Sequence, residues 1–208
     1  YGPRRRADGG PGGRSGMRLK IEPGAVVAAS LVYFFSDWTE ITATAAAIAV
    51  HELGHLAALR AFRLDVCSLR AELSGMCISY RGEGGTAANI ISAVAGPLMG
   101  LLYALAASRV NAATGEAWFA LSSGMSCILS LFNLLPIMPL DGGRILSEIL
   151  TAICGETRAA RASLAAGAVL SAALFAWGVW CLAVRRDITV YAAGAWLLVL
   201  QLKDLSQA

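Results

Sequence analysis

The sequence predicts an all-α polytopic membrane protein with about six transmembrane helices and a short β-hairpin between the second and third helices. The first observation is composition: 57% of the 208 residues are hydrophobic, 15% are charged, and the mean hydropathy is +0.61. An ordinary soluble domain has about a quarter of its residues charged. The second observation is that several apolar runs approach the roughly 20 residues that cross a hydrocarbon core about 30 Å thick. We therefore expect most of the chain to be helix surrounded by lipid.

The N-terminal residues are rich in Arg, Gly and Pro and contain no apolar run. This composition predicts a disordered basic segment over residues 1–20, followed by a single transmembrane domain over residues 21–208. A basic arm that touches anionic lipid is an alternative role for this segment. The first apolar run, residues 25–35, is short for a span but is counted as the first of the six helices.

The second predicted span, residues 41–62, contains both histidines of the chain, in the motif His51-Glu52-x-x-His55. Side chains at positions i and i+4 share one helix face, so both imidazoles can reach one metal ion at roughly 2.0–2.1 Å. Glu52 supplies a carboxylate that can take a proton from a water activated by that metal. Ionisable residues inside an apolar span are costly, which indicates a functional site. The structural alternative is that the three side chains only hydrogen-bond to neighbouring helices.

Residues 69–80 alternate apolar and polar side chains on both sides of Ser74-Gly75, which predicts a hairpin at the membrane surface. An exposed edge strand in this hairpin could bind an extended substrate as an additional β-strand. A hairpin that merely connects two helices is the alternative interpretation.

The third and fourth predicted spans, residues 87–107 and 117–135, are followed by a break in the apolar pattern, where two prolines precede Asp141 and two glycines follow it. Non-helical backbone at membrane depth is tolerated only where it is buried in protein or lines a wet cavity. A carboxylate there needs a cation beside it. Because the chain has no third histidine, Asp141 is the best candidate for a third metal ligand. The alternative is a helix-ending turn in which Asp141 pairs with Arg144.

The last two apolar runs are residues 164–184 and the shorter run 188–202. Lys and Arg in short loops prefer the cytoplasmic side of a membrane. The basic N-terminal residues, the arginines after the second span and those after the fourth span all meet this rule if both termini are cytoplasmic, whereas Arg185 and Arg186 do not. The net charge of +3 reflects this topology and gives no reason to expect nucleic-acid binding.

These motifs resemble those of the site-2 proteases, a family of intramembrane zinc metalloproteases. The family carries His-Glu-x-x-His in one transmembrane helix and Asn-x-x-Pro-x-x-x-x-Asp-Gly in a later one. Both are present in this order, the first from His51 to His55 and the second from Asn133 through Pro136 to Asp141.

An intervening helix of the family carries Gly-x-x-x-(Asn/Ser/Gly), which Gly96 and Gly100 match. Small residues four apart permit close helix approach. The compact arrangement is most similar to the sporulation branch of the family, whose members cleave a pro-sigma factor at the membrane.

The resemblance implies one Zn²⁺ per chain held by His51, His55 and Asp141, with Glu52 as the general base and Asn133 binding substrate or an oxyanion. It implies hydrolysis of a peptide bond in or near the transmembrane segment of a membrane-associated protein, such as a pro-sigma factor or another membrane-tethered regulator. The implied partners are that substrate, the lipid bilayer and a regulatory membrane protein. The implied location is a bacterial cytoplasmic or forespore membrane.

Two other classes of protein compete with this prediction. A metal or ion transporter places ionisable groups along a path and often contains an internal repeat. Here the ionisable groups converge on one site, and the sequence shows no repeat. A non-catalytic membrane scaffold usually loses the base or a ligand, yet Glu52 and all three candidate ligands are present. The sequence therefore predicts an enzyme.

Overall fold

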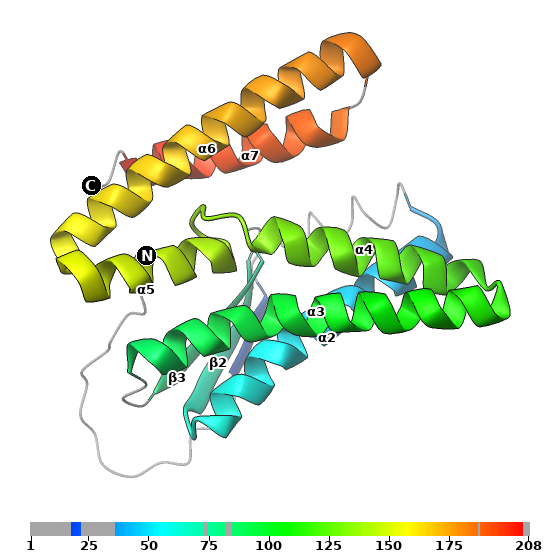
Figure 1. Ribbon diagram of the computed structural model, residues 1–208, viewed down its shortest axis with the longest axis horizontal. Coiled ribbons are helices and arrows are strands. Elements are labelled where there is room, and N and C mark those ends of the chain that lie inside the picture. The colour runs from blue at the N-terminus through cyan, green and yellow to red at the C-terminus, as the bar shows by residue number, and fades with distance from the viewer. Residues whose placement is uncertain (1–17, 22–35, 73–74, 82–84, 187, 206–208) are drawn as a thin grey trace. The chain divides into compact units, whose positions relative to one another are not determined.

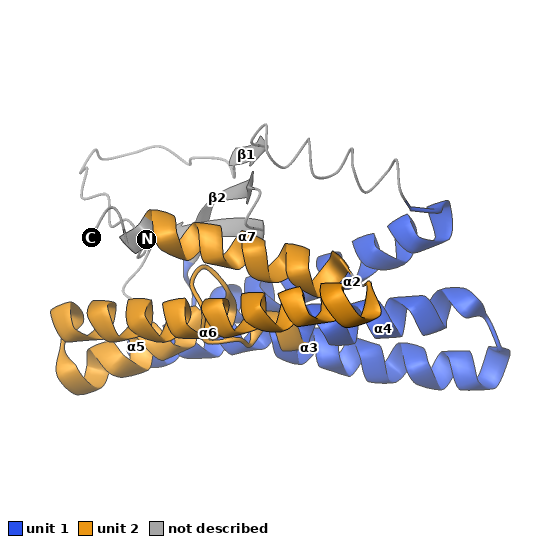
Figure 2. Cartoon of the chain, turned by 90° about the horizontal axis from the view of Figure 1, so that it is seen from above, with its two compact units in different colours: residues 1–130 blue, residues 131–208 orange. Residues whose placement is uncertain are grey.

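The computed structural model describes residues 18–21, 36–72, 75–81, 85–186 and 188–205 (Figure 1). Contacts between residues divide the chain into two compact units, Tyr1–Ser130 and Leu131–Ala208, which Figure 2 shows in different colours. The first unit holds the two histidines, and the second holds Asp141.

Helices α2 (Trp38–Ala61) and α3 (Thr86–Thr114) pack against each other in the first unit. The backbone N–H of Asp37, which precedes α2, donates to Glu40 Oε2 at 3.3 Å, so the first turn of the helix closes on its own cap. Helix α3 is followed by Gly115 as its C-cap, whose φ of 72° suits a residue without a Cβ.

Helix α4 (Ala117–Asn133) is joined to α3 by serine hydroxyls. Ser126 Oγ donates to the carbonyl of Gly100 at 2.8 Å, and Ser123 Oγ donates to the carbonyl of Ala104 at 2.7 Å. Small hydroxyl side chains allow the two backbones to approach closely and to bond across the interface. The serines therefore fix the pairing of α3 with α4 without bulky side chains.

Three short strands form one sheet in the order β1 (Arg18–Ile21), β2 (Asp65–Glu72) and β3 (Gly75–Arg81). Strand β1 runs parallel to β2, and β2 runs antiparallel to β3. Strand β1 precedes α2 in the chain, whereas β2 and β3 lie between α2 and α3.

The second unit consists of three helices, α5 (Asp141–Cys154), α6 (Glu156–Arg185) and α7 (Ile188–Leu205). Helices α6 and α7 approach closely at two glycines: a Cβ on Gly178 would lie 2.6 Å from Tyr191 Cα, and one on Gly194 would lie 2.8 Å from Phe175 Cα. The apolar core of the second unit contains Ile137, Leu140 and Leu197.

In both units many small residues are buried and many large apolar residues are exposed. Small residues such as Ala43, Ala93 and Ala159 are buried, whereas Leu105 is 57% exposed and Val169 is 69% exposed. A water-soluble protein buries its large apolar side chains, whereas helices in lipid pack through small residues and turn large ones outward. Helices α2, α3 and α6 are long and apolar enough to cross a membrane. These features are those of an integral membrane protein.

The predicted count of about six transmembrane helices is wrong, since only three helices among the described residues have the required length and apolar composition. The span predicted over residues 117–135 is the 17-residue helix α4, which ends at Asn133. Two prolines follow, Pro136 and Pro139, and proline cannot donate the backbone hydrogen bond that would continue a helix. Helix α7 is also a shorter apolar helix. Residues 25–35 lie outside the described residues.

The prediction of an all-α protein with only a short hairpin between two helices is also wrong, because the strands belong to a three-stranded sheet. Alternation within residues 69–80 could not indicate the partner Arg18–Ile21, which pairs with β2 across a long sequence separation. Helix α5 was not predicted, because the glycines at its start favour a turn. Residues 1–17 lie outside the described residues, so the domain boundary at residue 20 stays a prediction.

Candidate metal centre

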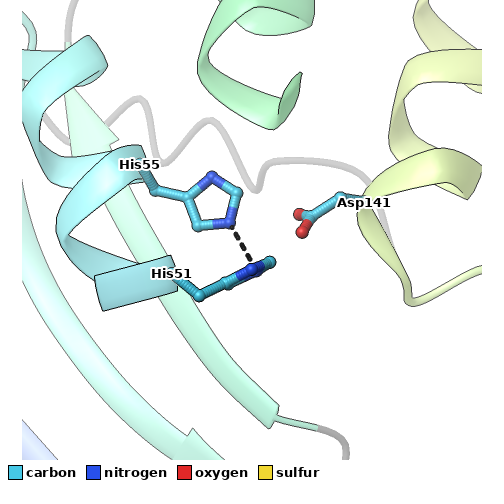
Figure 3. Close-up of side chains that lie close together, drawn as sticks. All are labelled: His51, His55 and Asp141. Atoms are coloured by element: carbon cyan, nitrogen blue, oxygen red, sulfur yellow. Dashed lines mark hydrogen bonds between the residues drawn. The ribbon is translucent and has the colours of Figure 1, made fainter. Parts of the chain in front are cut away.

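His51 and His55 lie one turn apart on α2 and present their Nε2 atoms to each other (Figure 3). The two atoms are 3.2 Å apart, and the side chains are buried, at 4% and 6% exposure. Two nitrogens bound to one tetrahedral Zn²⁺ at about 2.0–2.1 Å lie about 3.3 Å from each other. The histidine pair thus already has the spacing of two ligands of one metal ion.

A backbone carbonyl orients His55. Its Nδ1 lies 2.7 Å from the carbonyl oxygen of Ser92 on α3. Because a carbonyl can only accept, Nδ1 carries the hydrogen and donates it, which leaves the lone pair of Nε2 directed away from Ser92. Metal-binding histidines commonly donate their second ring nitrogen in this way, because the bond fixes both tautomer and ring orientation.

Two glycines make room for this arrangement. A Cβ on Gly54 would lie 2.5 Å from the carbonyl oxygen of Ala95 and 2.9 Å from Met99 Cβ, so α2 and α3 meet almost backbone to backbone. A Cβ on Gly96 would overlap the His55 ring, including its Cδ2 atom at 2.7 Å. The glycine predicted from the Gly-x-x-x-Gly pattern therefore faces His55, and glycine is required there for space.

Glu52 follows His51 on α2 and is partly buried. Its Oε2 atom is shielded from solvent. A carboxylate adjacent to a metal-ligand pair in the sequence is suited to accept a proton near the metal. Its assignment as the base stays a prediction.

Asp141 is the first residue of α5 and is 7% exposed. It follows a non-helical loop of residues 134–140, the loop that ends α4. Cβ atoms on the next two residues would collide with this loop: on Gly142 with the carbonyl oxygens of Leu134 and Leu135, and on Gly143 with the carbonyl group of Ile137. The glycines after Asp141 thus fold the loop tightly over the start of α5.

The alternative of a simple Asp141–Arg144 pair is only partly met. The Arg144 Nη1 and Asp141 Oδ1 atoms are 3.7 Å apart, and the arginine side chain is 41% exposed. This separation exceeds hydrogen-bonding distance, and solvent around the arginine weakens its attraction to the carboxylate. Arg144 therefore does not account for the burial of the carboxylate.

His51 and His55 of the first unit and Asp141 of the second are the candidate metal ligands. All three residues are buried (Figure 3). Two imidazole nitrogens and a carboxylate oxygen are a donor set that Zn²⁺ accepts, with the fourth position left for water or substrate. The residues thus fit a catalytic zinc ion chemically.

Asn133 is the last residue of α4 and is partly buried, eight residues before Asp141. Its role toward substrate stays a prediction. Sequence reasoning missed the carbonyl of Ser92 as a partner of His55, because backbone acceptors carry no residue-specific signal. It also missed Gln201 on α7, which donates to the Asp141 loop. A lone glutamine within an apolar run was the available signal.

Comparison with known proteins gives consistent matches. The model of Peptidase family M50 matches residues 86–176, from the start of α3 into α6. The chain is 34% identical over 117 residues to "Putative zinc metalloprotease sll0528" of Synechocystis sp., covering 53% of this chain and 31% of that protein. It is 33% identical over 146 residues to "Putative zinc metalloprotease Rip3" of Mycobacterium tuberculosis, covering 64% and 37%. The chain therefore spans about a third of the length of these relatives.

A solved structure has the same fold. The site-2 protease from Methanocaldococcus jannaschii matches with a TM-score of 0.69 at 18% identity, and the match covers 90% of both chains. The names of these relatives do not mention sporulation, so the assignment to that branch stays a prediction.

Proposed function

We propose that this chain, a relative of the Peptidase family M50 with the fold of a site-2 protease, is an intramembrane zinc metalloprotease. It would hydrolyse a peptide bond in or near the transmembrane segment of a membrane-associated protein. The observation that carries the proposal is the burial of His51, His55 and Asp141 in a chain that exposes many large apolar side chains.

His51, His55 and Asp141 are the proposed ligands of one Zn²⁺ per chain. The names of the two curated relatives support zinc, and so does the donor set of two imidazoles and one carboxylate. When bound, Zn²⁺ lowers the pKa of a coordinated water toward about 7 and polarises a nearby carbonyl group. The bond from His55 to Ser92 keeps Nε2 in the tautomer that can bind a cation.

Glu52 is the proposed general base. It takes the proton of the attacking water and passes it to the leaving amine nitrogen as the peptide bond breaks. Burial of Oε2 supports this role, because a shielded carboxylate exchanges its proton with the reacting groups rather than with bulk water. Asn133 is proposed to hold the substrate through its side-chain amide.

The charged ends of the helices support a topology for the protein. Arg60 and Arg63, at the end of α2, and Arg158, near the start of α6, are exposed. By the preference of basic residues for the cytoplasm, these helix ends are cytoplasmic, so the histidines lie nearer that face. We propose a multi-pass protein of a bacterial cytoplasmic or forespore membrane. A pro-sigma factor or another membrane-tethered regulator is the proposed substrate, and a membrane protein is the proposed regulator.

The test combines zinc content with cleavage of β-casein by the protein purified in detergent. Wild type is expected to hold one zinc and to cleave casein. Glu52→Gln is expected to retain zinc and to lose cleavage by at least about 100-fold, the contribution of a general base. His55→Ala and Asp141→Ala are expected to lose both. Glu40→Gln, which changes the same residue type at the capped end of α2, is the control and is expected to match wild type.

Each outcome has a separate meaning. Full zinc retention in Asp141→Ala would remove the third ligand from the proposal. Undiminished cleavage by Glu52→Gln would overturn the assignment of the base. A wild-type protein that binds no zinc would overturn the proposed function.

A further inference from the structure

Gln201 is an unusual residue in helix α7. It is a polar residue in a mostly apolar stretch of that helix, and its side chain is only 1% exposed. Burying an amide without hydrogen bonds costs roughly 1–3 kcal/mol in proteins. A buried glutamine in an apolar helix therefore lowers the stability of the protein unless its amide forms a hydrogen bond.

The partner of Gln201 is the loop that precedes Asp141. Its Nε2 donates to the backbone carbonyl of Met138 at 2.6 Å. The direction of this bond follows from chemistry, because a carbonyl can only accept and the amide oxygen cannot donate. Met138 stands three residues before Asp141, so the bond acts on the segment that delivers the carboxylate.

The loop needs such a donor. Residues 134–140 leave the helical pattern, and Pro136 and Pro139 have no backbone N–H. The loop makes two short bonds of its own, from the N–H of Ile137 to the carbonyl of Leu135 at 2.7 Å and from the N–H of Leu140 to the carbonyl of Ile137 at 2.8 Å. The Met138 carbonyl is satisfied from outside the loop, by α7. In an apolar environment an exposed backbone carbonyl has no water to bond.

Helix α6 holds the other side of the glutamine amide. A Cβ on Gly167 would lie 2.7 Å from Gln201 Oε1 and 3.1 Å from Cδ. The amide therefore lies between α6 and the loop. Leu197, one turn earlier on α7, is fully buried and packs with Ile137 and Leu140 of the same loop. Helix α7 thus contacts the loop by packing at Leu197 and by a hydrogen bond at Gln201.

We propose that Gln201 is a positioning residue that fixes the Met138 carbonyl, and through this loop sets the carboxylate of Asp141 for metal binding. The inference rests on the proposed function, because it needs Asp141 to be a ligand. Residues that orient metal ligands typically change metal affinity by about 10- to 100-fold when they are mutated. We expect the lower end of this range, about 10-fold, since Gln201 acts through the backbone of the loop.

The experiment compares Gln201→Met, which keeps length and burial but removes the donor, with Leu197→Ala, which removes packing but keeps the donor. Both are purified in detergent as full-length protein. Metal affinity is measured by titration with Co²⁺ and Zn²⁺, the Co²⁺ absorption bands report ligand geometry, and thermal unfolding of the metal-free protein reports stability. Gln201→Met is expected to weaken metal binding about tenfold and to alter the Co²⁺ bands. Leu197→Ala is expected to lower the unfolding midpoint with unchanged Co²⁺ bands.

Gly167→Ala is the second variant and leaves Gln201 itself intact. Its new methyl group would press on the amide, so it is expected to alter the Co²⁺ bands in the same sense as Gln201→Met. The inference would be overturned if Gln201→Met and Gly167→Ala both kept wild-type bands and affinity while Asp141→Ala lost the metal. That result would leave the proposed function standing. A wild-type protein that binds neither ion would overturn the proposed function instead.

Discussion

Helix α3 holds His55 by direct contact, whereas a loop and helices α6 and α7 hold Asp141. The ring of His55 bonds to the carbonyl of Ser92 and lies against Gly96, both within regular helix. Asp141 depends on a non-helical loop that its own glycines, an apolar core and Gln201 fold into place. The histidines therefore lie in a rigid pair of packed helices, whereas the aspartate is held by contacts from several segments of its unit. We expect the second arrangement to be more sensitive to small changes.

Gly142→Ala should produce the largest effect. Its Cβ would collide with the carbonyl oxygens of Leu134 and Leu135, the latter at 2.5 Å, and backbone atoms cannot rotate aside. The loop must shift, and a displacement of about 1 Å at a reacting centre costs on the order of 100-fold in rate. Casein cleavage and zinc content test this. Gly124→Ala is the control, because nothing lies within 4 Å of a Cβ there. Activity within twofold of wild type would show that the loop is pliable.

Gly96→Ala should come next. Its Cβ would overlap a side chain, the His55 ring, which can rotate only by giving up its 2.7 Å bond to the Ser92 carbonyl. Losing such a bond is expected to weaken zinc binding roughly 10- to 100-fold. Competition with a chromophoric chelator measures this affinity, again against Gly124→Ala. An unchanged affinity would mean that the contact between Gly96 and His55 does not position the ligand.

Gly54→Ala should have a smaller effect. A Cβ there would lie 2.5 Å from the Ala95 carbonyl oxygen and 2.9 Å from Met99 Cβ, which would push α2 away from α3 as a whole. Overpacking costs about 1–3 kcal/mol, offset by up to about 1 kcal/mol because alanine favours helix over glycine. Thermal unfolding in detergent should therefore shift to lower temperature. A rise in the midpoint would contradict close packing at this point.

Ser126→Ala should have the smallest effect. It removes the 2.8 Å bond to the Gly100 carbonyl, which is worth about 0.5–1.5 kcal/mol, and leaves the ligands in place. The midpoint of thermal unfolding should fall slightly, and zinc affinity should not change. Ser130→Ala is a matched control on the same face of α4, because Ser130 Oγ is buried and has no hydrogen-bond partner among the described residues. Equal destabilisation by the two variants would show that packing, and not the hydrogen bond, stabilises the contact between α3 and α4.

The closeness of the two histidines was more predictable than the fold. A spacing of four residues on a helix is enough to place His51 beside His55, because the helical period alone brings them together. Asp141 could be chosen by its chemistry and its surrounding prolines and glycines. The number of spans was overestimated, since apolar composition continues past Asn133 while the backbone cannot remain helical through the prolines.

Composition and spacing thus established a membrane protein with a histidine pair and a carboxylate suited to a metal ion. They could not identify the contacts that hold these side chains. Ser92 and His55 are separated by 37 positions, and Met138 and Gln201 by 63. The first contact uses a backbone carbonyl, which every residue possesses, and the second joins a loop to a distant helix. The first leaves no periodic or compositional signal, and the lone glutamine in an apolar run does not reveal that Met138 is its partner. Each contact depends on which segments pack together in space.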